Sequence, residues 1–403
     1  MPITLFSLIA GGALSSAMIP VLLSTTSRDG EEAARRLTNL VLNLLLGAFA
    51  VLVLLGGLLT PGFVSHVLAP GFDGKTSQLT VDLTRIMLIQ PVILAVGSVI
   101  TAVLNSRNQF LLTGVSVATH NTGLIIGIMA ARLHPTLGIY GPTAGVVLGA
   151  ILQVLILVPG MTGSAFQYHP LFNFADSRLR EVIALLIPNG LAVGVMYTGF
   201  IVDTAFASNS REAAALPAIH NAFLLVALPI ALLGQAIGQS VFPRLAAYAD
   251  NRDWLRMRGS LVRAVLTVVV LAVPMVLGWI VLGRPTIRVL FEHGRFGSSA
   301  GRLTYDVLVA YSIALPAYVA TEVLTRGLIA LRDTRTPLLT NTAQIIGGFF
   351  FMALLIGSVG VLAVPRSFAV MATLETVALA TVLAVELQRR IHSLTRASAR
   401  STA

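Results

Sequence analysis

Long apolar blocks alternate with short polar segments along almost the whole chain. The block at 37–59, LTNLVLNLLLGAFAVLVLLGGLL, is typical, and a helix of about 20 such residues is long enough to cross a bilayer. The pattern predicts an all-α polytopic membrane protein with about eleven transmembrane helices. The predicted spans are 3–23, 37–59, 81–104, 110–132, 137–158, 181–206, 214–242, 260–282, 303–330, 337–356 and 367–387.

The composition supports this class of protein. Of 403 residues, 56% are hydrophobic and 11% are charged, whereas soluble domains carry about 25% charged residues. A net charge of +10 would suggest nucleic-acid binding in a soluble protein, but loops of a membrane protein also collect Lys and Arg. The sequence has no cysteine and shows no catalytic or metal-binding motif. We therefore expect no nucleic-acid partner, no enzyme activity, no metal and no cofactor.

The distribution of basic residues predicts which loops face the cytoplasm. One set of alternate loops, together with the C-terminal tail, carries about twice as many Lys and Arg residues as the other set, and such loops are usually cytoplasmic. The rule places 24–36, 244–259 and the tail at 388–403 in the cytoplasm, and 60–80 and 283–301 outside. An odd number of spans then places the N-terminus outside.

An internal repeat links the two halves of the chain. Pro20 and Pro243 end similar apolar segments and are followed by Arg-rich segments, and Arg107 and Arg332 follow later helices at nearly the same spacing. The matching helices of the two halves end on the same predicted side of the membrane. This indicates a parallel repeat about an axis along the membrane normal. The repeat predicts two lobes around a central cavity.

The lobes differ in their number of helices. We expect an N-terminal lobe of five helices at 1–158, a cytoplasmic connection at 159–180, a C-terminal lobe of six helices at 181–387 and a basic cytoplasmic tail at 388–403. The helix at 181–206 has no counterpart in the first lobe, so the repeat predicts that the upstream reading frame encodes one more apolar helix.

Several motifs resemble those of one transporter family. They are GGALSSAMIPVL (11–22), APGF (69–72), AVLNSRNQF (102–110), LPIALLGQAIGQSVFPRLA (228–246), LFEHGRF (290–296) and RDTRTP (332–337). Together they resemble the lipid II flippase family MurJ/MviN of the multidrug/oligosaccharidyl-lipid/polysaccharide exporter superfamily. In this resemblance the chain lacks the first family helix and the last two.

The resemblance implies two six-helix lobes around a cavity in the cytoplasmic membrane of a bacterium. It implies a flippase that moves an undecaprenyl-pyrophosphate-linked peptidoglycan precursor outward for cell-wall biogenesis and cell shape, with membrane lipids and cell-wall synthesis proteins as partners. An ion gradient or the membrane potential would drive it. The sequence departs from the family at Phe6 and Ser7, where arginines are usual, and at Phe223 and Leu224, where a cavity Asp-Arg pair is usual. Two alternatives therefore stay open: an exporter of another amphiphile or lipid-linked polysaccharide, and a transport-inactive relative that binds lipid or protein partners.

Polar residues inside the predicted spans are the candidate functional groups, because a charge at mid-bilayer costs about 2.5–3.5 kcal/mol on insertion scales. Glu322 and Arg326 are four residues apart and either neutralise each other or offer a cavity cation to substrate. Asp203 lies near the outer end of its span, and Glu375 lies deeper with no partner within a turn. The substrate or cavity candidates are Arg326, Glu322, Asn121, His120, Asn189 and Asn221, and the ion-coupling candidates are Glu375 and Asp203.

The connection at 159–180 carries four aromatic residues, Phe166, Tyr168, Phe172 and Phe174. Aromatic side chains are enriched where one side is apolar and the other is wet. We therefore expect this connection to lie at an interface rather than in free solution.

Overall fold

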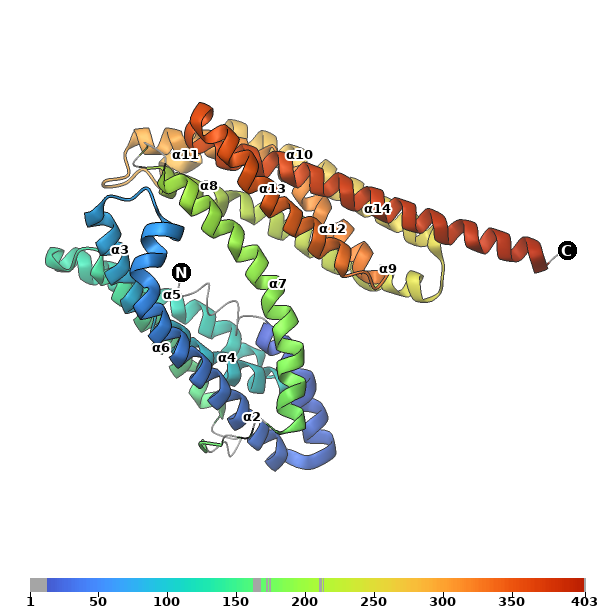
Figure 1. Cartoon of the computed structure of the whole chain (residues 1–403), viewed down its shortest axis with the longest axis horizontal. Helices are drawn as coiled ribbons and strands as arrows, with labels where there is room; N and C mark the ends of the chain where they lie inside the picture. The colour runs from blue at the N-terminus through green and yellow to red at the C-terminus, as the bar shows by residue number, and fades with distance from the viewer. Residues whose placement is uncertain are drawn as a thin grey trace. The chain divides into compact units, whose positions relative to one another are not determined.

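The described part of the chain forms helices joined by short loops in a computed structural model (Figure 1). The structure describes the backbone of residues 13–161, 168–171, 173, 175–209, 212 and 214–401, and their side chains apart from 13, 16, 188–198 and 394–401. The helices are α2 (Ala13–Phe63), η1 (Val64–Leu68), α3 (Gly74–Met87), α4 (Gln90–Ser106), α5 (Phe110–Leu133), η2 (Pro135–Leu137), α6 (Tyr140–Met161), α7 (Ser177–Ser208), α8 (Ala215–Pro229), η3 (Ile230–Gln235), α9 (Ala236–Asp250), α10 (Trp254–Leu290), α11 (Ser298–Ser312), α12 (Leu315–Ala330), α13 (Arg335–Val359), η4 (Gly360–Leu362) and α14 (Ala363–Ser401).

Seven of the described helical segments are long and apolar enough to cross a membrane, and the bent pair α11 and α12 makes an eighth. Two of these segments, Ala17–Leu68 and Arg335–Ser393, have 52 and 59 residues. At 1.5 Å per residue each exceeds about 75 Å, which is more than twice the hydrocarbon thickness of a bilayer. The first covers residues 17–23 of the predicted span 3–23 and the span 37–59, divided at the non-helical Gly30, and the second covers the spans 337–356 and 367–387, divided at η4. Most of the described residues of the predicted spans thus lie on helices.

Two of the predicted spans are broken where the sequence contains a proline. The span at 81–104 is interrupted between α3 and α4, and the span at 303–330 is interrupted between α11 and α12, which meet at 46°. Pro91 and Pro316 lie in the first turn of the following helix. A proline has no backbone N–H to donate and clashes with the preceding turn, so each break falls just before it.

The contacts divide the chain into two compact units, unit 1 (Met1–Thr198) and unit 2 (Gly199–Ala403). The division falls inside α7, later than residue 181, where the sequence predicts the second lobe to begin; the lobe boundaries stay a prediction. In unit 1, residues Leu179, Val182 and Leu186 at the start of α7 are buried with side chains of α2 and α4.

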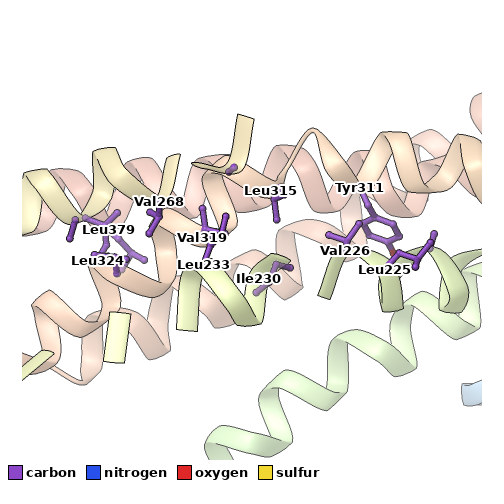
Figure 2. Packing of buried hydrophobic residues seen from close by; sticks show 14 of the residues in the cluster. Leu225, Val226, Ile230, Leu233, Val268, Tyr311, Leu315, Val319, Leu324 and Leu379 are labelled. Atoms are coloured by element: carbon purple, nitrogen blue, oxygen red, sulfur yellow. The ribbon is translucent and has the colours of Figure 1, made fainter. Parts of the chain in front are cut away.

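The core of unit 2 is built around α12. Leu315, Val319 and Val323 recur every four residues on one face of this helix and are completely buried, as expected for the apolar stripe of a helix that packs on several others. Figure 2 shows Leu315 and Val319 among Val226 and Leu233 of the neighbouring α8 and η3. This packing places the polar residues of α12 at defined positions within unit 2.

The repeat predicted from the sequence appears in the backbone as two equivalent turns. After α4, Asn108 adopts φ 61°, and the N–H of Gln109 donates to the carbonyl of Leu104 at 2.9 Å. After α12, 224 residues later, Arg332 adopts φ 65°, and the N–H of Asp333 donates to the carbonyl of Leu328 at 3.0 Å. Both turns end a helix with one left-handed residue that satisfies free carbonyls. The two turns lie at positions that the repeat relates, and the parallel orientation of the repeat stays a prediction.

Asp333 then caps the start of α13. Its carboxylate accepts hydrogen bonds from the backbone N–H groups of Arg335 and Thr336, each at 3.0 Å, and from the hydroxyl of Thr336 at 2.6 Å. These bonds, led by the Thr336 hydroxyl, hold the pKa of Asp333 below its usual value. The RDTRTP motif is therefore a turn followed by a helix cap.

Glycines bring α5 and α6 into backbone contact in unit 1. Gly123 and Gly127 of α5 face Gly141, Gly145 and Gly149 of α6. A Cβ atom at Gly145 would lie 2.7 Å from the carbonyl oxygen of Gly123 and 2.8 Å from the Cα of Gly127. Helices in lipid associate through close packing of this kind, because no hydrophobic effect drives them together.

Two buried asparagines of α2 hold the connection between the predicted lobes. The Nδ2 group of Asn43 donates to the carbonyls of His169 at 3.2 Å and Leu171 at 2.8 Å, and its Oδ1 accepts from the hydroxyl of Tyr168 at 2.7 Å. Asn39, one turn earlier, accepts from the N–H of His169 at 3.2 Å. Tyr168 thus contacts α2, and the position of the connection at an interface stays a prediction; Phe166, Phe172 and Phe174 lie outside the described residues.

The glycine contact predicts a strong effect of a single methyl group. We expect Gly145→Ala to destabilise unit 1 by about 1–3 kcal/mol, because backbone atoms cannot rotate away from the new Cβ. Gly114→Ala in α5 is the matched control, since nothing lies within 4 Å of the added atom, and we expect it to be neutral or stabilising. Thermal unfolding in detergent measures both; equal midpoints for Gly145→Ala and the wild type would contradict the packing.

The asparagine contacts predict that Asn43→Leu releases the segment around Tyr168. Loss of buried hydrogen bonds costs about 1–3 kcal/mol, so chymotrypsin should cleave after Tyr168 about tenfold faster or more. Asn121→Leu is the control, because Asn121 is exposed on α5. Unchanged cleavage in the Asn43 variant would show that these bonds do not hold the segment.

Candidate functional site

Glu322 and Arg326 lie on one face of α12 above two glycines of the neighbouring helices. A Cβ atom at Gly234 of η3 would lie 3.1 Å from the Cγ of Glu322, and one at Gly238 of α9 would lie 3.4 Å from the Cγ of Arg326. The glycines, four residues apart, leave room for the aliphatic parts of both side chains. The glycines of η3 and α9 therefore allow the charged residues of α12 to pack closely against these two segments.

The two side chains interact electrostatically but form no ion pair within 4.0 Å in the described part of the chain. The spacing of four residues permits such a pair, yet the Nε atom of Arg326 is buried and has no hydrogen-bond partner among the described residues. A guanidinium offers five N–H donors. Arg326 therefore has donor capacity that the described part of unit 2 does not use.

Glu375 lies close to the same face of α12. Its side chain is 7% exposed on α14, and its Oε1 accepts from the hydroxyl of Thr340 on α13 at 3.4 Å. It interacts electrostatically with Glu322, and Tyr318 interacts with both carboxylates. We call Tyr318, Glu322, Arg326, Thr340 and Glu375 the unit 2 polar cluster.

Hydroxyl groups join the helices beside this cluster. The hydroxyl groups of Thr321 on α12 and Thr376 on α14 lie 2.8 Å apart, and Thr376 donates to the carbonyl of Ala317 at 2.9 Å. Such bonds hold neighbouring helices together in lipid. Sequence spacing alone shows no partner for Glu375 because its partners come from α12 and α13, which are distant in the chain.

Asp203 has a different neighbour. It lies on α7 in unit 2 and interacts electrostatically with Tyr311 of α11, a side chain that is only 1% exposed. Figure 2 shows Tyr311 beside Leu225 and Val226 in the core of unit 2. The two predicted ion-coupling residues, Asp203 and Glu375, therefore have different surroundings within the unit.

The predicted histidine and asparagine candidates belong to two units. His120 lies on α5 beside Gly149 and Gln153 of α6, and its Nδ1 is buried without a hydrogen-bond partner in the described ranges. Asn121 is exposed on the same helix. Asn221 is half-buried on α8 in unit 2, and the side chain of Asn189 on α7 lies outside the described residues.

Several other positions bear on the predicted site. Phe6 and Ser7 lie outside the described residues. Phe223 packs edge-to-face against Tyr311 and Phe368, with ring centres 5.7 and 6.2 Å apart, so it belongs to an aromatic core. The described residues contain no group of three or more His, Cys, Asp or Glu side chains that could hold a metal ion.

The polar contacts of unit 1 are not predicted from the sequence. Asn39 and Asn43 are 2% and 3% exposed, and Arg178 pairs with Asp29 at 2.8 Å beside the bend at Gly30. Two asparagines one turn apart within the apolar block at 37–59 were the available signal, because a polar group in such a span needs a partner.

Comparisons with known proteins agree with this architecture. The chain is 27% identical over 342 residues to "Lipid II flippase MurJ" of Burkholderia cenocepacia, covering 83% of this chain and 66% of the relative. It is 30% identical over 353 residues to "Probable lipid II flippase MurJ" of a Synechocystis species, covering 83% of this chain and 64% of the relative. The chain thus spans just under two thirds of the length of these relatives.

Two solved structures share the fold. One is "Lipid II flippase MurJ, inward closed conformation", with a TM-score of 0.78 at 22% identity, covering 95% of this chain and 78% of that chain. The other is a multidrug resistance MATE family transporter of the MOP superfamily in an inward-facing conformation, with a TM-score of 0.85 at 12% identity, covering 97% of this chain and 90% of that chain. The family described as "Lipid II flippase MurJ" matches residues 1–403, and the chain therefore belongs to that family.

Proposed function

We propose that this chain is part of a lipid II flippase, a transporter rather than an enzyme, in the cytoplasmic membrane of a bacterium. The family match over residues 1–403 carries the proposal. The names of the curated relatives and the long apolar helices support it. The proposed substrate is an undecaprenyl-pyrophosphate-linked cell-wall precursor, which crosses the membrane as two lobes expose a cavity alternately on each side.

The chemistry of this substrate defines what the protein must supply. A pyrophosphate is an anion that cannot enter lipid without compensating charge, and arginine binds phosphate groups with two parallel hydrogen bonds. Arg326 is the strongest candidate for this contact, because its buried Nε has no partner in the described part of unit 2. Glu322 would hold the guanidinium while substrate is absent, through the electrostatic interaction between them.

The remaining candidates have roles that follow from their positions. Glu375 shares the unit 2 polar cluster with Arg326, so an ion that binds there would change the charge near the proposed substrate contact. Asp203 is the second ion-coupling candidate. His120, Asn121, Asn189 and Asn221 are proposed as neutral contacts to the polar head group.

Another amphiphile is the second candidate substrate, and one position favours it. Phe223, where the family has a charged cavity residue, lies in an aromatic core, and Leu224 beside it is 53% exposed. These two apolar side chains offer no charge to a pyrophosphate, which favours a less charged head group. The third candidate, a transport-inactive relative, is separated from both by a direct transport assay.

Substitution of Arg326 tests the proposed contact. In proteoliposomes with fluorescent lipid II and an impermeant quencher, we expect Arg326→Gln to slow flipping by about tenfold or more, since a hydrogen bond to a charged group contributes about 1.5–3 kcal/mol. Arg326→Lys should be intermediate because a lysine cannot bind the phosphate with two parallel bonds. Arg256→Gln is the control, since the Arg256 side chain is 76% exposed.

The reversed pair, Glu322→Arg with Arg326→Glu, separates a structural from a transport role. If Arg326 binds substrate, the reversed protein should fold and lose flipping. Normal flipping by the reversed protein would remove Arg326 from the site. If the wild type flips another amphiphile but not lipid II, the second candidate substrate is correct. If it transports neither, the chain is a transport-inactive relative.

The proposed orientation, with the C-terminus in the cytoplasm, is tested by labelling. Because the chain has no native cysteine, Ser27→Cys and Lys75→Cys each give one thiol, and both positions are exposed. On intact cells an impermeant thiol reagent should label position 75 and leave position 27 unlabelled until the membrane is opened. The reverse pattern would overturn the orientation.

A further inference from the structure

An apolar groove of about 460 Å³ runs between α11, α13 and α14 of unit 2, away from the residues of the unit 2 polar cluster. Its apolar lining is formed by Val309, Ile313, Phe351, Leu355, Ala369 and Val370. Ile313 is 65% exposed and Val370 is 41% exposed. On a unit that spans a membrane, such a lining meets acyl chains rather than water.

Two opposite charges line the same groove. Asp306 of α11 and Arg366 of α14 are both exposed, and neither forms an ion pair within 4.0 Å with a residue that the structure describes. Nearby helices of the unit show the contrasting arrangement, because Arg284 of α10 pairs directly with Glu292. The groove therefore presents one carboxylate and one guanidinium that remain available to a ligand.

Each charge is followed along its own segment of chain by apolar lining residues of the groove. Arg366 is in the first turn of α14 and Asp306 is near the middle of α11, whereas Val370 and Ile313, the residue that follows α11, lie four and seven residues further along the chain. At 1.5 Å per residue, the apolar lining continues about 6–10 Å beyond the charges. This depth falls within one leaflet of a hydrocarbon core about 30 Å thick.

We propose that this groove binds one phospholipid whose head group carries a phosphate and a primary ammonium, as in phosphatidylethanolamine. The guanidinium of Arg366 donates to the phosphate, the carboxylate of Asp306 accepts from the ammonium, and one acyl chain lies along Ile313 and Val370. A quaternary choline has no N–H to donate, and a glycerol head group has no cation. The site is separate from the transported cargo and does not rest on the flippase proposal.

Lipid retention by the purified chain tests the site. The chain is extracted from membranes with equal amounts of phosphatidylethanolamine, phosphatidylglycerol and phosphatidylcholine, and bound lipid is counted by native mass spectrometry. We expect preferential retention of phosphatidylethanolamine. Arg366→Gln should lower that retention by about tenfold, as for loss of a hydrogen bond to a charged group, and Asp306→Asn should abolish the preference over phosphatidylglycerol.

Two further pairs of variants control for folding and for general surface charge. Ala369→Phe fills the groove and should lower retention, whereas Ala353→Phe changes an exposed alanine of α13 outside it and should not. Arg288→Gln removes an arginine that is 71% exposed and does not line the groove, so retention should be unchanged. If Arg366→Gln unfolds, Arg366→Lys keeps the charge and should retain the lipid.

Three results would overturn the proposal. They are equal retention of all three lipids by the wild type, unchanged retention in Arg366→Gln, and equal effects of Ala369→Phe and Ala353→Phe. Flipping activity is measured separately on the same variants. Loss of lipid retention with normal flipping supports the lipid site without testing the flippase proposal. Normal lipid retention with loss of flipping contradicts the lipid site.

Discussion

The structure depends on one constraint, that backbone N–H and C=O groups inside a bilayer must find partners within the protein. The described part of the chain satisfies these groups by forming helices. The helices are interrupted where a backbone donor is already missing or where a turn supplies another partner. The breaks before Pro91 and Pro316 occur where proline removes a donor. Beyond the ends of α4 and α12, the left-handed residues Asn108 and Arg332 turn the chain so that the carbonyls of Leu104 and Leu328 find N–H partners. The same kind of turn therefore recurs at points where helices stop.

The same constraint governs the polar side chains. Asn43 of α2 is buried because the connection at 168–171 needs partners for its carbonyl groups, and the asparagine supplies them. Glu375 lies within reach of Thr340. Arg326 differs, since its buried Nε lacks a partner in the part of unit 2 that the structure describes. A group of this kind costs free energy in the resting protein, and this cost is the physical basis for assigning Arg326 a ligand.

Unit 2 presents two kinds of polar site. The unit 2 polar cluster lies among α12, α13 and α14, where Gly234 and Gly238 leave room for Glu322 and Arg326. The groove of Asp306 and Arg366 is lined by exposed apolar side chains. The first suits a cargo that must be shielded from lipid, and the second suits a lipid that stays in the membrane. Their separation lets each be tested without disturbing the other.

The sequence alone determined the helical class and most of the apolar helices, because apolar length, proline positions and turn residues are local properties of the chain. It also identified Glu322, Arg326 and Glu375, because charges within apolar blocks are conspicuous. Only the tertiary structure decided which groups meet: Glu375 with Thr340, Asn43 with Tyr168, and Gly145 with Gly123. These pairs are 35, 125 and 22 residues apart in sequence, and contacts between helices depend on how the helices pack, which periodicity within one helix does not specify.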